Sequence, residues 1–151
     1  MDQTSSPSGL KVLIVEDNLD HAEMIKRSFN RSGQWSDIVW AKDGQEALEY
    51  FDTCLKATPS LPNLILLDIK MPRIDGLEVL RQIKSHPRLK LIPVVMLTTT
   101  DREEEVLSSY ELGANGYVTK PMGAKDFFEK MEMIQVFWAQ ANKTARPEIR
   151  C

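Results

Sequence analysis

The chain has 151 residues, 42% of them hydrophobic, which is enough for one core of ordinary size but not for two independent domains. Its formal net charge of -3 gives no basic field that would hold nucleic acid or an anionic membrane surface, so we expect neither as a partner. The sequence has no recognisable signal peptide and no apolar run near the roughly 20 residues of a membrane-spanning helix, so it predicts a cytoplasmic protein.

After an N-terminal tail over residues 1–9, which we expect to be disordered, short apolar runs alternate with longer segments of helical periodicity. The apolar runs predict five strands, at residues 11–15, 37–41, 64–67, 94–97 and 116–118. The longer segments predict five helices, at residues 20–32, 45–55, 76–85, 102–112 and 124–141. A longer loop is expected at 56–63 and a C-terminal tail at 142–151, which leaves one domain over residues 10–141.

The predicted strands lack the polar alternation of a half-exposed sheet, which indicates a parallel sheet with helices on both faces. Right-handed crossovers between such strands give an α/β, doubly wound fold. In that fold, ligands bind beyond the carboxyl ends of the strands. Functional residues are therefore expected directly after the predicted strands.

Polar residues gather at these strand ends, namely Glu16, Asp17, Asp68, Thr98 and Lys120. Each alone is unremarkable, because an acidic residue after a strand is usually a helix cap or a solvated turn. Two carboxylates about 4 Å apart repel by roughly 4 kcal/mol at an effective dielectric near 20, so three together need a cation or shifted pKa values. Magnesium suits carboxylate oxygens and leaves positions for water and phosphate, so the set predicts a Mg2+ site.

Three of these residues are candidate catalytic groups for phosphoryl chemistry. Lys120 can pair with a phosphoryl oxygen as a mobile point charge, and the Thr98 hydroxyl can hydrogen-bond another. Asp68 is the candidate nucleophile, because carboxylates form acyl phosphates by in-line attack.

Four motifs occur in order along the chain: VLIVEDN at 12–18, LILLDIKMPRIDG at 64–76, VVMLTT at 94–99 and GYVTKP at 116–121. Together they strongly resemble the receiver domains of two-component response regulators, the CheY-like superfamily, and the resemblance covers about residues 10–140. It implies a flavodoxin-like (βα)5 sandwich whose five-stranded parallel sheet has the order 2-1-3-4-5. Within the second motif, Asp75 and Gly76 are expected only to form the turn into the third helix.

The resemblance also implies a role for each site residue. Asp68 would accept a phosphoryl group from a histidine kinase, so the protein would be a signalling phosphoacceptor and not a classical enzyme. Glu16, Asp17, Asp68 and the backbone carbonyl of Lys70 would hold Mg2+. Lys120 would bridge the carboxylates and the phosphoryl group.

Thr98 and Tyr117 resemble the switch pair of these domains. The Thr98 hydroxyl would move toward the phosphoryl group, and the Tyr117 ring would turn into the space left behind. The alternative for Tyr117 is a partly exposed strand residue with no switching role. The bond between Lys120 and Pro121 resembles the cis peptide bond usual in the family.

The sequence implies that both the phosphoryl donor and the downstream target are other proteins. Neither histidine, His21 nor His86, lies in a pattern resembling the phosphorylated helix of a histidine kinase, and both are expected to be solvated. After the last predicted helix only a short tail follows, so output is expected through surface contact with a downstream protein that the sequence does not identify.

The last predicted helix carries two apolar stripes. The stripe that suits a core-facing helix contains Phe127, Met131, Ile134 and Trp138. The second stripe contains Met133, Val136, Phe137 and Ala141. Exposed apolar patches often mark interfaces, so the helix from Phe127 to Ala141 predicts a homodimer. Packing of the second stripe against the loop or the tail is the alternative.

Three stretches carry a finer resemblance: the 56–63 loop, HPRLKLIPVVMLTTTDREEEVLSSYELGANGYVTKP, and the ending DFFEKMEMIQVFW. They look like the phytochrome-associated single-domain response regulators of cyanobacteria and other bacteria. This resemblance implies that the donor kinase is a light-sensing phytochrome.

Three other protein classes fit the pattern less well. Enzymes of the haloacid dehalogenase type have a D-x-D motif that begins at the acceptor aspartate. Here Lys70 stands two residues after Asp68, where the second acid would be. A non-phosphorylated, receiver-like binding module would lack a pocket residue, and all five are present. A flavodoxin-like flavin carrier would need a phosphate-binding loop after the first strand, where EDN would repel the phosphate.

Overall fold

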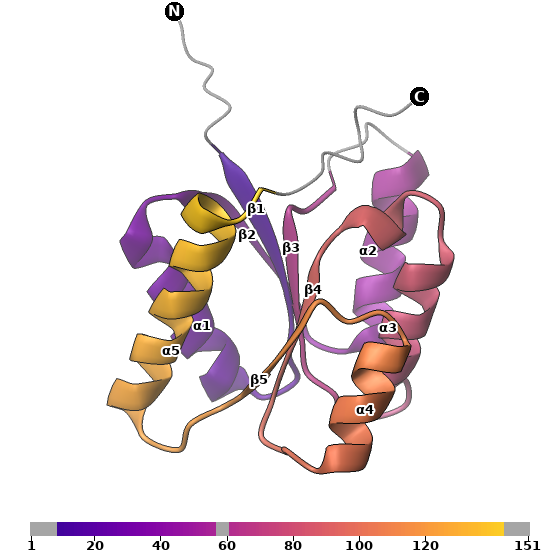
Figure 1. Cartoon of the computed structure of the whole chain (residues 1–151). Helices are drawn as coiled ribbons and strands as arrows, with labels where there is room; N and C mark the ends of the chain where they lie inside the picture. The colour runs from indigo at the N-terminus through magenta and orange to yellow at the C-terminus, as the bar shows by residue number, and fades with distance from the viewer. Residues whose placement is uncertain (1–8, 57–60, 144–151) are drawn as a thin grey trace, which may run out of the picture.

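The computed structural model describes residues 9–56 and 61–143, and its centre is a five-stranded parallel sheet (Figure 1). The strand order is β2-β1-β3-β4-β5, which confirms the predicted topology. The strands are β1 (Leu10–Val15), β2 (Trp35–Ala41), β3 (Leu64–Leu67), β4 (Val94–Thr98) and β5 (Gly116–Thr119). Most of the two expected tails, at 1–9 and 142–151, and part of the 56–63 loop lie outside the described residues.

Helices cover both faces of the sheet (Figure 1). On one face α1 (Leu19–Ser32) packs beside α5 (Ala124–Val136), and on the other lie α2 (Gly44–Lys56), α3 (Gly76–Ser85) and α4 (Glu103–Glu111). The first four predicted helices are confirmed to within one residue at each end. The fifth was predicted as one helix to residue 141, but it ends as an α-helix at Val136 and continues as a π-helical turn, η2 (Phe137–Ala141).

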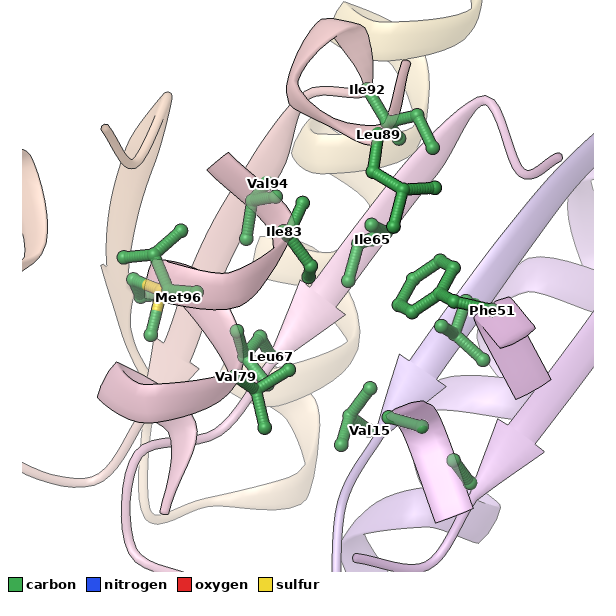
Figure 2. Close-up of a cluster of buried hydrophobic side chains, with 14 of the residues drawn as sticks. Val15, Phe51, Ile65, Leu67, Val79, Ile83, Leu89, Ile92, Val94 and Met96 are labelled. Atoms are coloured by element: carbon green, nitrogen blue, oxygen red, sulfur yellow. The ribbon is translucent and has the colours of Figure 1, made fainter. Parts of the chain in front are cut away.

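Neighbouring residues of each central strand enter opposite cores, which explains why the strand sequences are apolar throughout. Toward α2 and α3, the core includes Leu13, Val15, Ile65, Leu67, Val94 and Met96 (Figure 2). Toward α1 and α5, it includes Val12, Ile14, Leu64, Leu66, Val95 and Leu97. Each such side chain contributes about 1.5–3 kcal/mol by leaving water, so the sheet is a rigid base for the loops at its ends.

Short connecting elements complete the architecture. A 3-10 helix, η1 (Leu89–Leu91), joins α3 to β4 and was not predicted. The side chain of Asn18 caps α1 by accepting the backbone N–H of His21 at 3.0 Å. Such a cap satisfies a first-turn N–H that has no partner within the helix.

Within the described residues, every helix is too short or too polar to span a lipid bilayer.

Candidate functional site

The carboxyl edge of the sheet brings together the polar residues that follow its strands. Glu16 follows β1, Asp68 follows β3, Lys120 follows β5, and Thr98 is the last residue of β4. The parallel pairing of β1 with β3 places Glu16 beside Asp68. The backbone N–H of Lys120 donates to the carbonyl of Thr98 at 2.7 Å. These four residues therefore share one end of the sheet, although Glu16 and Lys120 are 104 positions apart.

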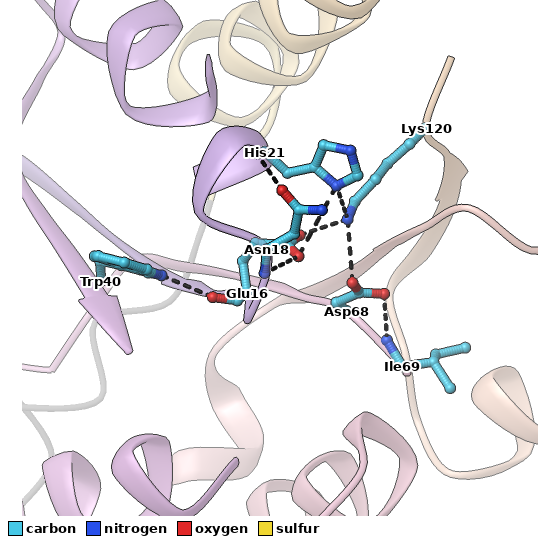
Figure 3. Close-up of polar contacts among 7 residues, drawn as sticks. All are labelled: Glu16, Asn18, His21, Trp40, Asp68, Ile69 and Lys120. Carbon is cyan, nitrogen blue, oxygen red and sulfur yellow. Dashed lines mark hydrogen bonds and ion pairs between the residues drawn. The ribbon is translucent and has the colours of Figure 1, made fainter. Parts of the chain in front are cut away.

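The Lys120 ammonium lies between the side chains of Glu16, Asp68 and His21 (Figure 3). It donates to Oε1 of Glu16 at 2.5 Å and to Oδ2 of Asp68 at 3.1 Å, and it lies 3.0 Å from Nδ1 of His21. The Lys120 side chain is buried. A buried ammonium is costly unless charged or polar partners surround it, so these contacts hold Lys120 in one place.

Both the side chain and the backbone of Glu16 are held by hydrogen bonds. Its Oε2 accepts the backbone N–H of Asn18 at 3.1 Å, while the Trp40 ring nitrogen donates to its backbone carbonyl at 2.8 Å. Burial, followed by the negative charge of Asp68, raises the pKa of Glu16 to about 7, although the Lys120 ammonium opposes this shift. The ionised form of Glu16 is therefore disfavoured, and additional positive charge nearby would stabilise it.

Three carboxylates form a cluster with the donor chemistry of a hard cation site. Glu16, Asp17 and Asp68 each place one oxygen within 4.8 Å of the other two. Glu16 and Asp68 are buried, whereas Asp17 is exposed, so solvent reaches the cluster from one side. All the donors are carboxylate oxygens, which suits Mg2+ and leaves room for water among its ligands. The three carboxylates of the predicted metal site thus fit such an ion in type and proximity.

Thr98 and Tyr117, the expected switch pair, differ in how their hydroxyl groups are satisfied. Thr98 is fully buried, and within the described residues its Oγ1 has no hydrogen-bond partner. The Tyr117 hydroxyl donates to the backbone carbonyl of Thr100 at 2.7 Å, and its ring packs partly buried against the α2–α3 core. A buried hydroxyl without a partner is unfavourable, so Thr98 is ready to bind an incoming acceptor.

The side chain of Lys70 points to a partner outside the carboxylate cluster. Its ammonium pairs with Glu105 on α4 at 2.8 Å and remains largely exposed. The side chain of Lys70 therefore links the loop after β3 to α4. The expected role of its backbone carbonyl as a metal ligand stays a prediction.

His21 is the site residue that the sequence reasoning missed, because it was expected to be solvated. Its side chain is only 30% exposed and lies against Lys120, with Glu16 Oε2 at 4.0 Å. Burial, and then the positive charge of Lys120, lowers the pKa of His21. The available signal was the Asn18 cap, which fixes residue 21 in the first turn of α1 above the strand end. His86 is also partnered, since its Nδ1 accepts backbone N–H groups three residues or fewer downstream.

Gly76 does more than form the turn expected from the sequence. Its N–H donates to the carbonyl of Ile69 at 2.8 Å, where α3 begins. A Cβ atom at this position would lie 1.9 Å from the carbonyl oxygen of Asp68. No real Cβ approaches backbone that closely, so only glycine lets α3 start against the Asp68 backbone.

The expected cis bond between Lys120 and Pro121 is not found, because the described residues contain no cis peptide bond. This prediction was wrong. Before proline, the trans form is the more stable by only about 0.5–1 kcal/mol, so the residue types alone do not decide the isomer.

Comparisons of the sequence with known proteins agree with one another. The sequence profile of the response regulator receiver domain matches residues 12–132, a span that contains every site residue described above. The chain is 40% identical over 136 residues to the probable methanogenesis regulatory protein FilR2 of Methanothrix harundinacea, a match that covers 90% of this chain and 88% of that protein. It is 38% identical over 141 residues to response regulator Rcp1 of Synechocystis, covering 93% and 95% of the two chains.

Solved structures give the same likeness in three dimensions. The phosphorylated cyanobacterial phytochrome response regulator RcpA superposes with a TM-score of 0.86 at 37% identity, over 91% of this chain and 99% of that one. The Mn2+-bound form of Rcp1 superposes with a TM-score of 0.84 at 36% identity, over the same shares.

Proposed function

The chain belongs to the response regulator receiver family, and on that premise we propose that it accepts a phosphoryl group from a histidine kinase onto Asp68 in a Mg2+-dependent reaction. The observation that carries this proposal is the buried Lys120 ammonium, which lies 2.5 Å from Glu16 and 3.1 Å from Asp68. An ammonium group at this place can stay paired with a carboxylate oxygen while that oxygen accepts a phosphoryl group. The protein is thus a signalling phosphoacceptor that promotes only its own phosphorylation and dephosphorylation.

The transfer step follows from the way Asp68 is held. Its Oδ1 accepts the backbone N–H of Ile69 at 2.7 Å, and its Oδ2 faces Lys120. A carboxylate oxygen attacks the phosphorus of the donor phosphohistidine in line with the ring nitrogen. The new P–O bond forms as the P–N bond breaks, and the nitrogen keeps the electron pair. Lys120 neutralises charge on one phosphoryl oxygen, and the partnerless Thr98 hydroxyl donates to another.

Glu16, Asp17 and Asp68, together with the backbone carbonyl of Lys70, are the proposed ligands of Mg2+. The proximity of the three carboxylates supports this assignment, as does the raised pKa of Glu16, at about 7. When bound there, Mg2+ supplies positive charge that neutralises the phosphoryl oxygens.

The signal is proposed to leave the site through Thr98 and Tyr117. As the Thr98 hydroxyl turns toward the phosphoryl group, it vacates space into which the Tyr117 ring moves. That movement breaks the hydrogen bond between the Tyr117 hydroxyl and Thr100, which is 2.7 Å long here. The surface around β5 then differs between the two states, and a downstream protein can distinguish them.

Intact-mass measurement with acetyl phosphate and Mg2+ tests the acceptor assignment directly. We expect one base-labile phosphoryl adduct on the parent protein. The Asp68→Asn variant keeps the shape of the side chain but loses the nucleophilic carboxylate, so it should carry none. Equal labelling of both proteins would refute the role of Asp68.

A phytochrome histidine kinase is the proposed donor, and the cytoplasm is the proposed place of the transfer. The likeness to RcpA, a phytochrome response regulator, supports this choice of kinase. Purified phosphorylated phytochrome kinase should transfer its phosphoryl group faster than an unrelated histidine kinase at equal concentration. Equal transfer rates from both kinases would argue against a phytochrome donor.

A homodimer through the C-terminal helix, from Phe127 to Ala141, is the proposed assembly. On this helix Phe127, Met131 and Ile134 are buried in the core, whereas Met133 and Phe137 are 63% and 47% exposed. A second copy would remove this apolar surface from water. Sedimentation should show a dimer that Phe137→Glu dissociates without unfolding the protein. A strict monomer at high concentration, with and without acetyl phosphate, would contradict the proposal.

A further inference from the structure

His21 occupies a place in the site that the proposed transfer step does not yet use. A protonated lysine has three N–H donors and no acceptor. Among residues 9–56 and 61–143, three groups surround the Lys120 ammonium, namely Glu16 Oε1 at 2.5 Å, His21 Nδ1 at 3.0 Å and Asp68 Oδ2 at 3.1 Å. The number of acceptors therefore equals the number of donors. Because Lys120 can only donate, His21 accepts through Nδ1 and carries its own proton on Nε2.

The imidazole ring is held in this orientation from two sides. The backbone N–H of His21 donates to Oδ1 of Asn18 at 3.0 Å, which fixes the residue in the first turn of α1. Its ring faces Phe127 of α5, with 6.0 Å between the ring centres. His21 thus reaches Lys120 from the α1–α5 side, while the carboxylates reach it from β1 and β3 (Figure 3).

We propose that His21 is a positioning residue for phosphoryl transfer, which fixes the direction of the Lys120 ammonium through the acceptor at Nδ1. This inference rests on the proposed function, because it assigns the orientation of Lys120 during that reaction. Glu16 and His21 each hold one N–H, so the remaining N–H faces Asp68 and follows its oxygen as the phosphoryl group arrives. Without the acceptor at position 21, the ammonium turns more freely and its alignment with the reacting oxygen is lost.

Three substitutions of His21 distinguish the effect of the acceptor at Nδ1 from the effect of the size of the ring. Asparagine places an amide oxygen at the branch position of Nδ1, leucine has the same branched shape without an acceptor, and phenylalanine keeps a ring against Phe127. At saturating Mg2+, we expect His21→Leu and His21→Phe to be phosphorylated by acetyl phosphate roughly three- to tenfold more slowly than the parent, the range of one net hydrogen bond. His21→Asn should recover most of the parent rate.

Mg2+ affinity, measured by calorimetry, distinguishes positioning of Lys120 from a merely structural role. A substitution that only disturbed the structure of the site would lower the affinity together with the rate. We expect the affinity to be unchanged in all three variants, because His21 is not a proposed ligand, and we expect each melting temperature to stay close to that of the parent. The proposal is overturned if leucine and phenylalanine leave the rate unchanged, if asparagine is as slow as leucine, or if Mg2+ affinity falls in parallel with the rate. A parent labelled on Asp68 with no effect at position 21 removes only this inference, whereas a parent without any adduct removes the proposed function as well.

Discussion

Two lysines lie at opposite edges of the sheet, Lys120 at the carboxyl edge and Lys84 near the amino edge. Each directs its ammonium group at three acceptors among the described residues. Two of the partners of Lys120 are carboxylates. Within the part of the chain that the structure describes, the partners of Lys84 are uncharged, namely the backbone carbonyls of Lys90 at 3.0 Å and Ile92 at 2.9 Å and the side-chain oxygen of Asn115 at 3.0 Å. Burial lowers the pKa of Lys84, because none of these described partners is an anion that would offset the lost hydration.

The difference shows how the same type of side chain serves two purposes in this protein. Lys84 ties α3 to the segments that lead into β4 and β5, and Asn115 extends this link by accepting the N–H of Val94 at 2.8 Å. None of these partners changes charge, so the contact is a fixed clamp. Lys120 faces groups that gain or lose charge during the proposed reaction, so its contacts must rearrange.

The largest contrast is expected from replacing each lysine by methionine. Lys120→Met should slow phosphorylation by acetyl phosphate roughly 10²- to 10³-fold, because it removes a preformed positive charge from the reacting oxygens. Lys84→Met should leave the rate close to that of the parent. The rates are read from intact mass against time, and a similar loss in both variants would contradict the division of roles.

Mg2+ should stabilise the folded protein through the carboxyl edge alone. At a free concentration 100-fold above the dissociation constant, the free energy of unfolding should rise by about 2.7 kcal/mol. Urea unfolding with and without Mg2+ measures this increment. Asp17→Asn should reduce it because a proposed ligand is lost, while Lys84→Met should keep it. An undiminished increment in Asp17→Asn would remove Asp17 from the ligand set.

The smallest effect concerns the clamp itself. Lys84→Met should lower the free energy of unfolding by about 2 kcal/mol, because partly buried carbonyl groups lose their donor. Lys90→Ala is the matched control, since only its backbone carbonyl takes part, and it should stay within about 0.5 kcal/mol of the parent. Urea midpoints distinguish the two, and equal losses would show that Lys84 adds nothing specific.

The same contrast explains what could be predicted from the sequence. Apolar runs such as Leu64–Leu67 mark the strands, and polar residues directly after them, such as Asp68, mark the edge where a doubly wound sheet binds ligands. The gathering of the site residues at one edge follows from these two patterns, whereas the strand order was implied by the family resemblance. The roles assigned to those residues came from the family resemblance and await the experiments above.

What could not be predicted depends on contacts between distant side chains. His21 meets Lys120 across 99 positions, and Lys84 meets Asn115 across 31. A local signal such as the Asn18 cap can place His21 in the first turn of α1, but it does not identify the distant partner. A histidine near the start of a helix is usually exposed, which made the solvated interpretation reasonable. The π-helical end of the last helix likewise has no periodicity that separates it from an ordinary helical turn.

Gly76 carries a consequence for comparing receivers by their motifs. One added methyl group there would collide with the backbone of Asp68 at 1.9 Å and displace it, while every polar residue of the pocket stayed in the sequence. A duplicated copy with alanine at this position would therefore still display the full set of acidic, hydroxyl and amine residues, yet its proposed acceptor would be out of place. Inventories of polar residues alone would count such a silent copy as competent.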